Sequence, residues 1–495
     1  MNEGFVKPEI ALGGIAPEIA LCITALLILV VHAFAGDRGK NLYLPLMSTA
    51  GLVAALALCV MVWGDTELQL ARMVALDGFA TFIKATLAVF GLLTVWLGRD
   101  YLAREGLEES EFYALVLFAV AGMMLMAGSA DLMMMFIALE TFSLALYVLV
   151  GYRRRSLAGQ ESSMKYFLLG SFSSAFFLLG IALAYGATGT TNLYTGTGEQ
   201  EIEGIFGFLS TAPSQETGLL VLAVGFLIVG LGFKVAAVPF HTWTPDAYQG
   251  APSPVTGFMA AASKLAGFAA LIRLLESAVF QLRWDWRPLV IGIAVLTMVV
   301  GSVLAVVQED LKRMLAYSSI AHAGFVFTGI IAANDRGVSG SLFYLATYGL
   351  TVLGAFAIVS VTAGRDERRV RLSDHRGLFY ENPLLAGALT LFLLSLAGVP
   401  ITSGFIGKLV VFGAAVEAGY EWVVVVGVLA SAIAAFFYLR VMVVMYMQEP
   451  ESPRPPLRPG PLAVGVIGLT AVATLVFGLA WSPLIRLAEQ ATFYF

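Results

Sequence analysis

Long apolar runs follow one another along the whole chain, and short segments with charged residues, glycine or proline separate them. Most of these runs reach the roughly 20 residues with which an α-helix crosses about 30 Å of hydrocarbon. A helix also satisfies its own backbone hydrogen bonds inside a bilayer. No ten-residue segment alternates polar and apolar positions, as the strands of a membrane β-barrel do. The pattern therefore predicts an all-α, polytopic membrane protein with about 14 transmembrane helices.

The predicted spans lie between the breaks in this apolar pattern. They cover residues 11–35, 42–63, 76–98, 112–128, 131–150, 163–186, 217–238, 252–275, 288–307, 314–333, 340–363, 383–413, 422–447 and 460–482. The first run is longer than the apolar segment of a signal peptide, so we expect it to remain as the first helix.

The composition agrees with lipid as the main solvent. Hydrophobic residues make up 59% of the 495 residues and charged residues 13%, and the mean hydropathy is +0.85. So few polar residues could not cover a water-facing surface of the required size. The formal net charge of -5 argues against a nucleic-acid binder. The two cysteines, Cys22 and Cys59, lie inside apolar runs and are too few for an iron–sulfur cluster or a zinc site.

Basic residues are distributed unevenly over the predicted loops. Numbered from the first span, the odd loops hold 16 of the 29 lysines and arginines, whereas the even loops and both termini hold 6. Cytoplasmic loops of membrane proteins are enriched in Lys and Arg. We therefore expect the odd loops in the cytoplasm and both termini outside.

Six basic residues away from the outer helix ends, and Glu140 at mid-span, make a set of seven charged groups inside predicted spans. At about 3 kcal/mol each on the insertion scale, they would cost roughly 20 kcal/mol if they faced lipid unpaired. They are Lys84, Glu140, Lys165, Lys234, Lys264, Lys408 and Arg440. Burial disfavours the charged form of each group, so such groups become able to exchange protons. A row of them is what a proton path needs.

Each of these residues also has a structural interpretation. Lys84, Lys165 and Arg440 lie near enough to span ends for a long side chain to reach the headgroups. That explanation fits the other four residues poorly. His322, in AYSSIAHAGF, could relay protons or could be a hydrogen-bonded core histidine.

Two of the lysines stand beside helix breaks. Lys234 lies in GLGFKVAAVPF within the seventh span, and Lys408 ends GVPITSGFIGK within the twelfth. Broken helices at membrane depth are tolerated where they line a cavity, and the free carbonyls at the end of a half-helix attract a cation. The breaks in helices 7 and 12 therefore favour a functional role for both lysines.

A weak internal repeat relates the two broken helices. Asp131-Leu-x-x-Met opens the fifth span and Asp310-Leu-x-x-Met leads into the tenth, and Lys234 and Lys408 follow 103 and 98 residues later. Two five-helix copies with an odd helix count would have opposite orientations. The chain then divides into an N-terminal three-helix segment (1–111), a first repeat with helices 4–8 (112–276), a second, inverted repeat with helices 9–13 (277–447) and a C-terminal helix (448–495).

Three stretches carry a family resemblance. VPFHTWTPDAYQGAPSPVTGFMAAASK (238–264), DLKRMLAYSSIAHAGF (310–325) and GVPITSGFIGKLVVF (398–412) resemble the antiporter-like membrane subunits of proton-pumping NADH:quinone oxidoreductase, respiratory complex I. The first stretch is similar to the smallest of these subunits rather than to its two larger relatives. The resemblance covers nearly the entire chain.

The resemblance implies a proton-translocating subunit without a redox centre of its own, in a bacterial inner membrane. It implies these roles: Glu140 and Lys234 as the ion pair of the first half-channel, Lys264 as the connecting group, Lys408 as the terminal proton carrier, and Lys165 and, less closely matched, His322 as additional groups. No cofactor or metal is expected in this chain, which lacks a glycine-rich dinucleotide turn. NADH, flavin, iron–sulfur clusters and quinone would belong to partner subunits of the complex.

Two other functions remain open at this point. A subunit of a multi-subunit sodium/proton antiporter would have similar helices and lysines, although the amino-acid sequence of residues 238–264 weighs against this function. A stand-alone solute carrier would also use inverted repeats and broken helices. It should carry polar residues suited to a substrate, whereas the interior charges here are mostly lysines.

The predicted topology can be tested with single cysteines. Cysteines placed at Ser373 and at Thr197 should react with a membrane-impermeant thiol reagent from opposite sides, with Ser373 on the cytoplasmic side. Labelling of both positions from one side would contradict the topology.

Overall fold

The computed structural model describes residues 11–37, 39–195, 203–211, 217–449, 457 and 459–493. Thr197 and the first ten residues, which bear on the predicted topology, lie outside the described residues. The described chain is almost entirely helical, as the apolar pattern predicts.

Within the part of the chain that the structure describes, twelve helices are long and apolar enough to cross a membrane. Their elements are α1 (Ala16–Ala35, preceded by η1, Gly13–Ile15), α2 (Lys40–Met61), α3 (Gly78–Glu105), α4 (Ser110–Gly128), α5 (Leu132–Val150), α6 (Leu157–Thr188), α10–α11 with two π-helical turns (α10 Ser253–Phe258, η3 Met259–Ser263, α11 Lys264–Arg273, η4 Leu274–Ala278), α12 (Arg283–Val306, preceded by η5, Phe280–Leu282), α13 (Leu311–Ala332), α14 (Asp335–Thr362), α18 (Glu421–Met447) and α19 (Pro461–Leu479). Each coincides with a predicted span.

The other two predicted spans are the broken ones. The seventh consists of α8 (Gly218–Lys234) and α9 (Trp243–Gly250), and the twelfth of α16 (Pro383–Ala397) and α17 (Ser403–Glu417). After α8, Ala236 has a φ of 61° and the Val238–Pro239 peptide is cis; after α16, Gly398 has a φ of 88°. These halves are shorter than a full crossing, so the count of 14 spans stays a prediction.

A few short elements were not predicted. They are the antiparallel hairpin of β1 (Glu67–Gln69) and β2 (Val74–Leu76), the short helices α7 (Ile205–Thr211), α15 (Leu378–Glu381) and α20 (Ser482–Glu489), and the turns η6 (Arg365–Glu367) and η7 (Leu372–His375). All of them lie in segments between the spans, where the apolar pattern gives no signal for elements this short.

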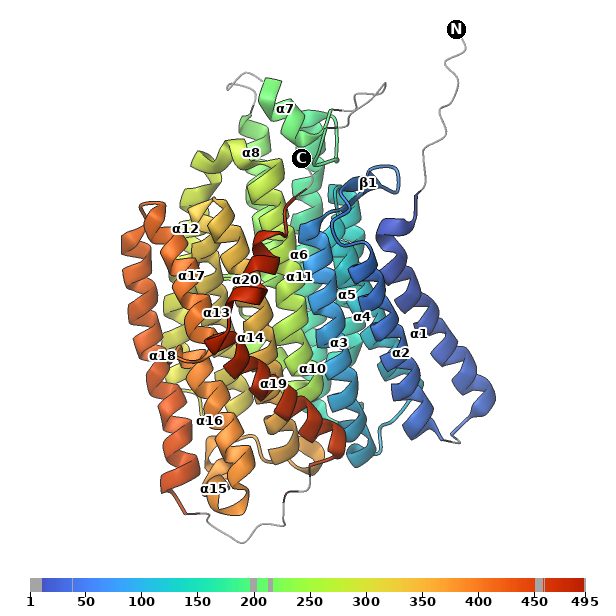
Figure 1. Ribbon diagram of the computed structural model, residues 1–495, viewed down its shortest axis with the longest axis vertical. Helices are drawn as coiled ribbons and strands as arrows, with labels where there is room; N and C mark the ends of the chain where they lie inside the picture. The colour runs from blue at the N-terminus through green and yellow to red at the C-terminus, as the bar shows by residue number, and fades with distance from the viewer. Residues whose placement is uncertain are drawn as a thin grey trace.

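The helices form a central core and a periphery. The apolar 18-residue stretches of the span Ser253–Ala278 and of α14 are entirely buried, and that of α13 is almost so, whereas only a third of the corresponding stretches of α1, α18 and α19 is buried. Figure 1 shows α13 and α14 in the middle of the bundle, with α1 and α2 at one edge and α18 at the other. The outer helices carry the exposed Ile, Leu, Val and Phe side chains that suit a lipid-facing surface. The polar residues of interest therefore lie on the central helices.

The two ends of α3 identify the two ends of the bundle. The β1–β2 hairpin precedes its first residue, and the Gly14 amide donates to Gln69 in β1 while the Phe79 amide donates to the Thr492 carbonyl. At the other end, Glu105 accepts a hydrogen bond from the Asp366 amide in the arginine-rich loop. Both ends of the described chain therefore lie at the hairpin end, opposite the basic loop.

The two proposed repeats begin in the same way. Asp131 caps α5 by accepting from the Met133 amide, and Asp310 caps α13 by accepting from the Arg313 amide. Each aspartate also forms an isolated β-bridge, to Asn192 and Arg371 respectively. This correspondence supports the alignment on which the repeat was inferred.

A buried ion pair joins α11 to the start of α3. Both terminal nitrogens of Arg273 contact Asp77, at 2.8 and 2.9 Å, and Nε donates to the Ala127 carbonyl. Asp77 also caps α3 through the Ala80 amide. The Arg273 side chain is fully buried.

Removal of this carboxylate should destabilise the subunit. Asp77→Ala leaves the buried guanidinium of Arg273 without its counter-charge, which costs about 3–5 kcal/mol. The measurement is the temperature at which half of the subunit is lost from the purified complex. Asp366→Ala is the control, because Asp366 and Arg368 form an exposed pair worth at most about 1 kcal/mol. Equal midpoints for the two variants would contradict the assigned role.

Candidate functional site

Lys234 is the last residue of α8 and lies in a pocket of aromatic rings. Its Nζ donates to the Ser143 hydroxyl at 2.6 Å. The same nitrogen lies 5.3 Å from the centre of the Tyr147 ring and 5.5 Å from that of Tyr166. A hydroxyl and π-faces hold the cation without neutralising it.

Glu140 lies on α5, one turn before Ser143, and accepts a hydrogen bond from the Ser174 hydroxyl. No oxygen of Glu140 is within 4.0 Å of the Lys234 ammonium among the described residues, so Ser143 lies where a direct contact was expected. Residues three apart on a helix share a face. This spacing is the signal that could have identified Ser143 from the sequence.

Lys264 follows the π-helical turn η3 at the centre of the bundle. Its Nζ donates to the backbone carbonyl of Ser319 on α13 and lies 5.8 Å from the centre of the Tyr348 ring. One turn further on, a Cβ on Gly267 would lie 3.3 Å from Cβ of Lys234. Lys264 therefore lies between Lys234 and α13.

His322 lies one turn beyond Ser319 on α13 and is buried. Its Nδ1 is 2.7 Å from the Tyr344 hydroxyl, and its Nε2 is 3.3 Å from the Tyr438 hydroxyl. Both ring nitrogens thus have hydroxyl partners, each able to donate or accept. These contacts satisfy a core histidine and would equally pass a proton along.

Lys408 lies on α17 with its ammonium against the end of α16. Nζ donates to the carbonyls of Leu396 and Ala397, at 3.1 and 3.0 Å, and to the Ser431 hydroxyl at 2.6 Å. These carbonyls are among the last of the half-helix, which have no partner inside it. Gly398 must be a glycine, because φ is 88° and a Cβ would lie 3.1 Å from Cδ of Lys408.

The three central lysines share one property. Lys234, Lys264 and Lys408 have no carboxylate within 4.0 Å among the described residues, whereas the buried lysines Lys84 and Lys312 have Glu18 and Glu367 at 2.7 Å. A carboxylate partner fixes the charge of a buried cation, since loss of the proton would leave the anion uncompensated. Hydroxyl and carbonyl partners leave no such anion behind. Such surroundings can accommodate a lysine in either its charged or its neutral form.

The remaining predicted residues lie outside this central row. Lys165 is half-exposed and pairs with Glu161 and Asp246, at 2.6 and 3.0 Å. The Lys84 side chain does not reach toward the lipid headgroups; it is buried and forms an ion pair with Glu18. Arg440 donates to the carbonyls of Val306 and Gln308, at the end of α12. The sequence pattern gave no signal for Glu18 or Asp246 as partners of these cations.

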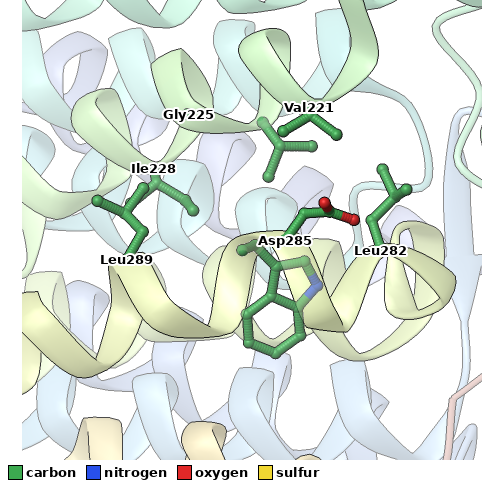
Figure 2. Close-up of a pocket in the computed structure, with 8 residues that line it drawn as sticks. Val221, Gly225, Ile228, Leu282, Asp285 and Leu289 are labelled. Atoms are coloured by element: carbon green, nitrogen blue, oxygen red, sulfur yellow. The ribbon is translucent and has the colours of Figure 1, made fainter. Parts of the chain in front are cut away.

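Two other features were considered as sites. Ligand atoms of His32, Asp37 and Glu109 lie within 4.8 Å of one another, but the Lys40 ammonium lies 2.7 Å from Asp37 and its hydrogen bond lowers the Asp37 pKa. A pocket of about 60 Å³ between α8 and α12 is lined mainly by aliphatic side chains (Figure 2). None of the central lysines lines it. Neither feature offers chemistry comparable with that of the lysine row.

Comparison with known proteins yields full-length similarities. Residues 129–434 match the family described as "NADH:quinone oxidoreductase/Mrp antiporter, TM". The chain is 43% identical to NADH-quinone oxidoreductase subunit N of Parafrankia sp., over 98% of this chain and 95% of that one. It is 41% identical to the subunit N of Trichlorobacter lovleyi, over 99% of each.

Solved structures show the same likeness. A chain of respiratory complex I from Thermus thermophilus with bound aureothin is 36% identical, with a TM-score of 0.79 over 96% of this chain and 99% of that one. A chain of the Mrp complex from Dietzia sp. DQ12-45-1b has a TM-score of 0.83 over 97% and 96%, at 22% identity, which shows a shared fold alone.

Glu140 and Lys234 should be coupled in proton transport. Each is costly alone, and Ser143, which accepts the hydrogen bond of Lys234, lies one helix turn from Glu140 on α5. Glu140→Gln removes the negative charge on α5 from the neighbourhood of the Lys234 ammonium. The experiment is a double-mutant cycle on pumping rate with Glu140→Gln, Lys234→Met and the double variant. Strictly additive effects on the logarithm of the rate would exclude coupling between the two residues.

Proposed function

Because this chain belongs to the NADH:quinone oxidoreductase/Mrp antiporter family of membrane proteins, we propose that it is subunit N of a proton-pumping NADH:quinone oxidoreductase. In this role it moves protons across the membrane while partner subunits carry out the redox chemistry. The relatives at 41–43% identity bear this subunit's name and match the chain from end to end.

One observation supports proton movement in particular: the buried lysines of the row are held by neutral oxygens. Lys234 binds a hydroxyl, Lys264 a carbonyl, and Lys408 two carbonyls and a hydroxyl. Each ammonium is stabilised while charged, and each neutral amine leaves only neutral groups behind. A charge on a neighbouring group can therefore change which form of each lysine, the charged ammonium or the neutral amine, is favoured.

A proton would move along the row in steps. A protonated Lys234 repels a proton on Lys264, whose carbonyl partner Ser319 is one turn from His322 on α13. His322 and Lys408 both contact the Phe325 ring. The centres of the His322 and Phe325 rings are 5.5 Å apart, and Nζ of Lys408 lies 4.7 Å from the centre of the Phe325 ring. Transfer of a proton onto one group thus lowers the proton affinity of the next. Like charges separated by a few ångströms inside a protein interact far more strongly than in water.

The redox steps would take place in other chains of the complex. NADH, flavin, iron–sulfur clusters and quinone would be bound there, and quinone reduction would drive the proton movement through this chain. The coupling would be electrostatic and conformational, because electrons need not enter the lysine row.

A partner subunit is expected against α5. Glu140 is partly exposed on the same face as Ile137 and Leu144, which are about half exposed. A carboxylate facing lipid at this depth is costly. Coverage of this face by another membrane subunit removes that cost and places Glu140 at a subunit boundary.

The antiporter alternative has the weaker support. The likeness to the Mrp complex extends to the fold at 22% identity, whereas the subunit N relatives share over 40% of their residues with this chain. Isolation of the native protein distinguishes the two functions. Flavin- and iron–sulfur-containing chains should co-purify with it.

Lys408 should be required for pumping and not for assembly. Lys408→Met retains length and apolar packing but removes the exchangeable proton, so coupled turnover and pumping should fall together. Lys408→Arg should also pump poorly, because a guanidinium holds its proton too tightly. The measurement is NADH-driven proton uptake by the reconstituted complex, with the assembled amount counted in parallel.

Lys40→Met is the matched control, since it removes an amine at the exposed end of α2, far from the row. It should pump as the unaltered complex does. Normal pumping by Lys408→Met would remove this lysine from the path and make a solute carrier the better interpretation.

A further inference from the structure

Two arginines begin α12 at the end of the bundle that carries the β1–β2 hairpin. Arg283 is the first residue of this helix, and Arg287 follows one turn later. The other end of α12 lies beside the basic loop, because Asp310, which precedes α13, forms a β-bridge with Arg371. The positive-inside rule assigns the hairpin end to the outside, where few basic residues are expected. The presence of two arginines in one turn therefore requires an explanation.

Aromatic rings surround both guanidinium groups. The guanidinium carbon of Arg287 lies 5.5 Å from the centre of the Trp284 ring and 5.5 Å from that of Tyr420. The guanidinium carbon of Arg283 lies 5.8 Å from the centre of the Trp284 ring and 4.8 Å from that of Phe280. Such contacts attract a cation to the face of a ring and leave its charge in place. The Trp284 ring thus lies beside two charged groups.

These two arginines lack an acidic partner in the part of the chain that the structure describes, since no carboxylate oxygen lies within 4.0 Å of either guanidinium. Arg287 is buried, with 8% of its surface exposed, and donates from Nη1 to the Tyr420 hydroxyl at 3.0 Å. Its Nε has no hydrogen-bond partner among the described residues. The buried Glu276 interacts electrostatically with Arg287 but lies beyond the distance of an ion pair. The Arg287 guanidinium therefore keeps donors for a further acceptor.

A bound anion would remove two costs of this arrangement. Like charges four residues apart on a helix repel each other, and a buried cation without a counter-ion is destabilising. A guanidinium presents parallel N–H groups whose spacing matches the oxygens of a phosphate. A phosphate between Arg283 and Arg287 would accept hydrogen bonds from both. The pair is therefore suited to a phosphate group.

The surroundings of the pair are those of the lipid headgroup level. Trp284 and Trp422 are 70% and 54% exposed at the starts of α12 and α18. These two helices pack together, and α18 forms one edge of the bundle in Figure 1. Exposed tryptophans are enriched at membrane–water interfaces. Further along the two helices, Leu289, Leu296 and Val425 are about half exposed. A phosphate with an apolar surface beneath it matches a phospholipid better than a free anion.

We propose that Arg283 and Arg287 bind the phosphate of a phospholipid in the outer leaflet of the membrane, between the starts of α12 and α18. The phosphate accepts from both guanidiniums, the Trp284 ring packs against the glycerol region, and the acyl chains follow the exposed aliphatic side chains. Because Arg287 also donates to Tyr420, the bound lipid ties α12 to α18. The site is separate from the lysine row, and the proposal does not depend on the proposed function.

The experiment is photolabelling of the native protein, purified with its partner chains. The probe is a phosphatidylglycerol with a diazirine near the glycerol end of one acyl chain, and mass spectrometry identifies the labelled peptides. Labels should concentrate on the first turns of α12 and α18, relative to the lipid-facing residues of α1. A diacylglycerol with the same diazirine chain lacks the phosphate. It should label these turns about tenfold less, because the charge-assisted hydrogen bonds are lost.

The double variant Arg283→Gln/Arg287→Gln should lower labelling by phosphatidylglycerol by about tenfold, for the same reason. Arg486→Gln is the matched control, because it removes an exposed arginine of α20 at the hairpin end, outside this cluster. It should leave the labelling unchanged. If the double variant fails to assemble, the comparison of the two lipids on the unaltered protein still decides the question.

Three results would overturn the proposal. Equal labelling of the first turns by the two lipids would show that the phosphate is not recognised. Complete loss of labelling in excess inorganic phosphate would identify a site for the free anion. Absence of labelling, together with release of a partner chain by Arg283→Gln/Arg287→Gln, would assign the arginines to a carboxylate of that partner.

Discussion

The high free energy of an unpaired charge in a lipid-surrounded interior is the constraint on which the rest of this structure depends. Every buried cation of the described chain has oxygen partners, and the kind of oxygen separates the cations into two groups. Arg273, Lys84 and Lys312 have carboxylates, which pin helices together and fix the charge. Lys234 and Lys408, like Lys264, have hydroxyls and carbonyls, which support a charge and also tolerate its loss.

A helix break supplies two of those neutral oxygens to Lys408, whereas Lys234 and Lys264 receive theirs from the unbroken helices α5 and α13. The end of α16 turns its last carbonyls toward Lys408, and the turn after α8 leaves Lys234 at the end of its helix beside Ser143. An unbroken helix would use these carbonyls internally. The local loss of helical hydrogen bonds at the end of α16 thus creates the binding site of the Lys408 ammonium, and the corresponding break in the first half follows directly after Lys234.

Two contacts join the two halves of the molecule near the three central lysines. Lys264 contacts the second half through Ser319, and Asp246 contacts it through Arg313. The first contact is fully buried and the second partly exposed. A change at the exposed contact is therefore the easier one.

The sequence by itself determined the helical, membrane-spanning architecture, the two broken helices and the lysines at mid-membrane depth. These features follow from local requirements, since the length of an apolar run and a Gly/Pro interruption are read within about 20 residues. Only the tertiary structure decided which oxygens meet which cation. Arg273 and Asp77 are 196 residues apart in the chain, and Ser431 and Asp246 carry no pattern that marks them as lysine partners. Such pairings depend on how distant helices pack, and the apolar pattern that forms the helices does not specify that packing.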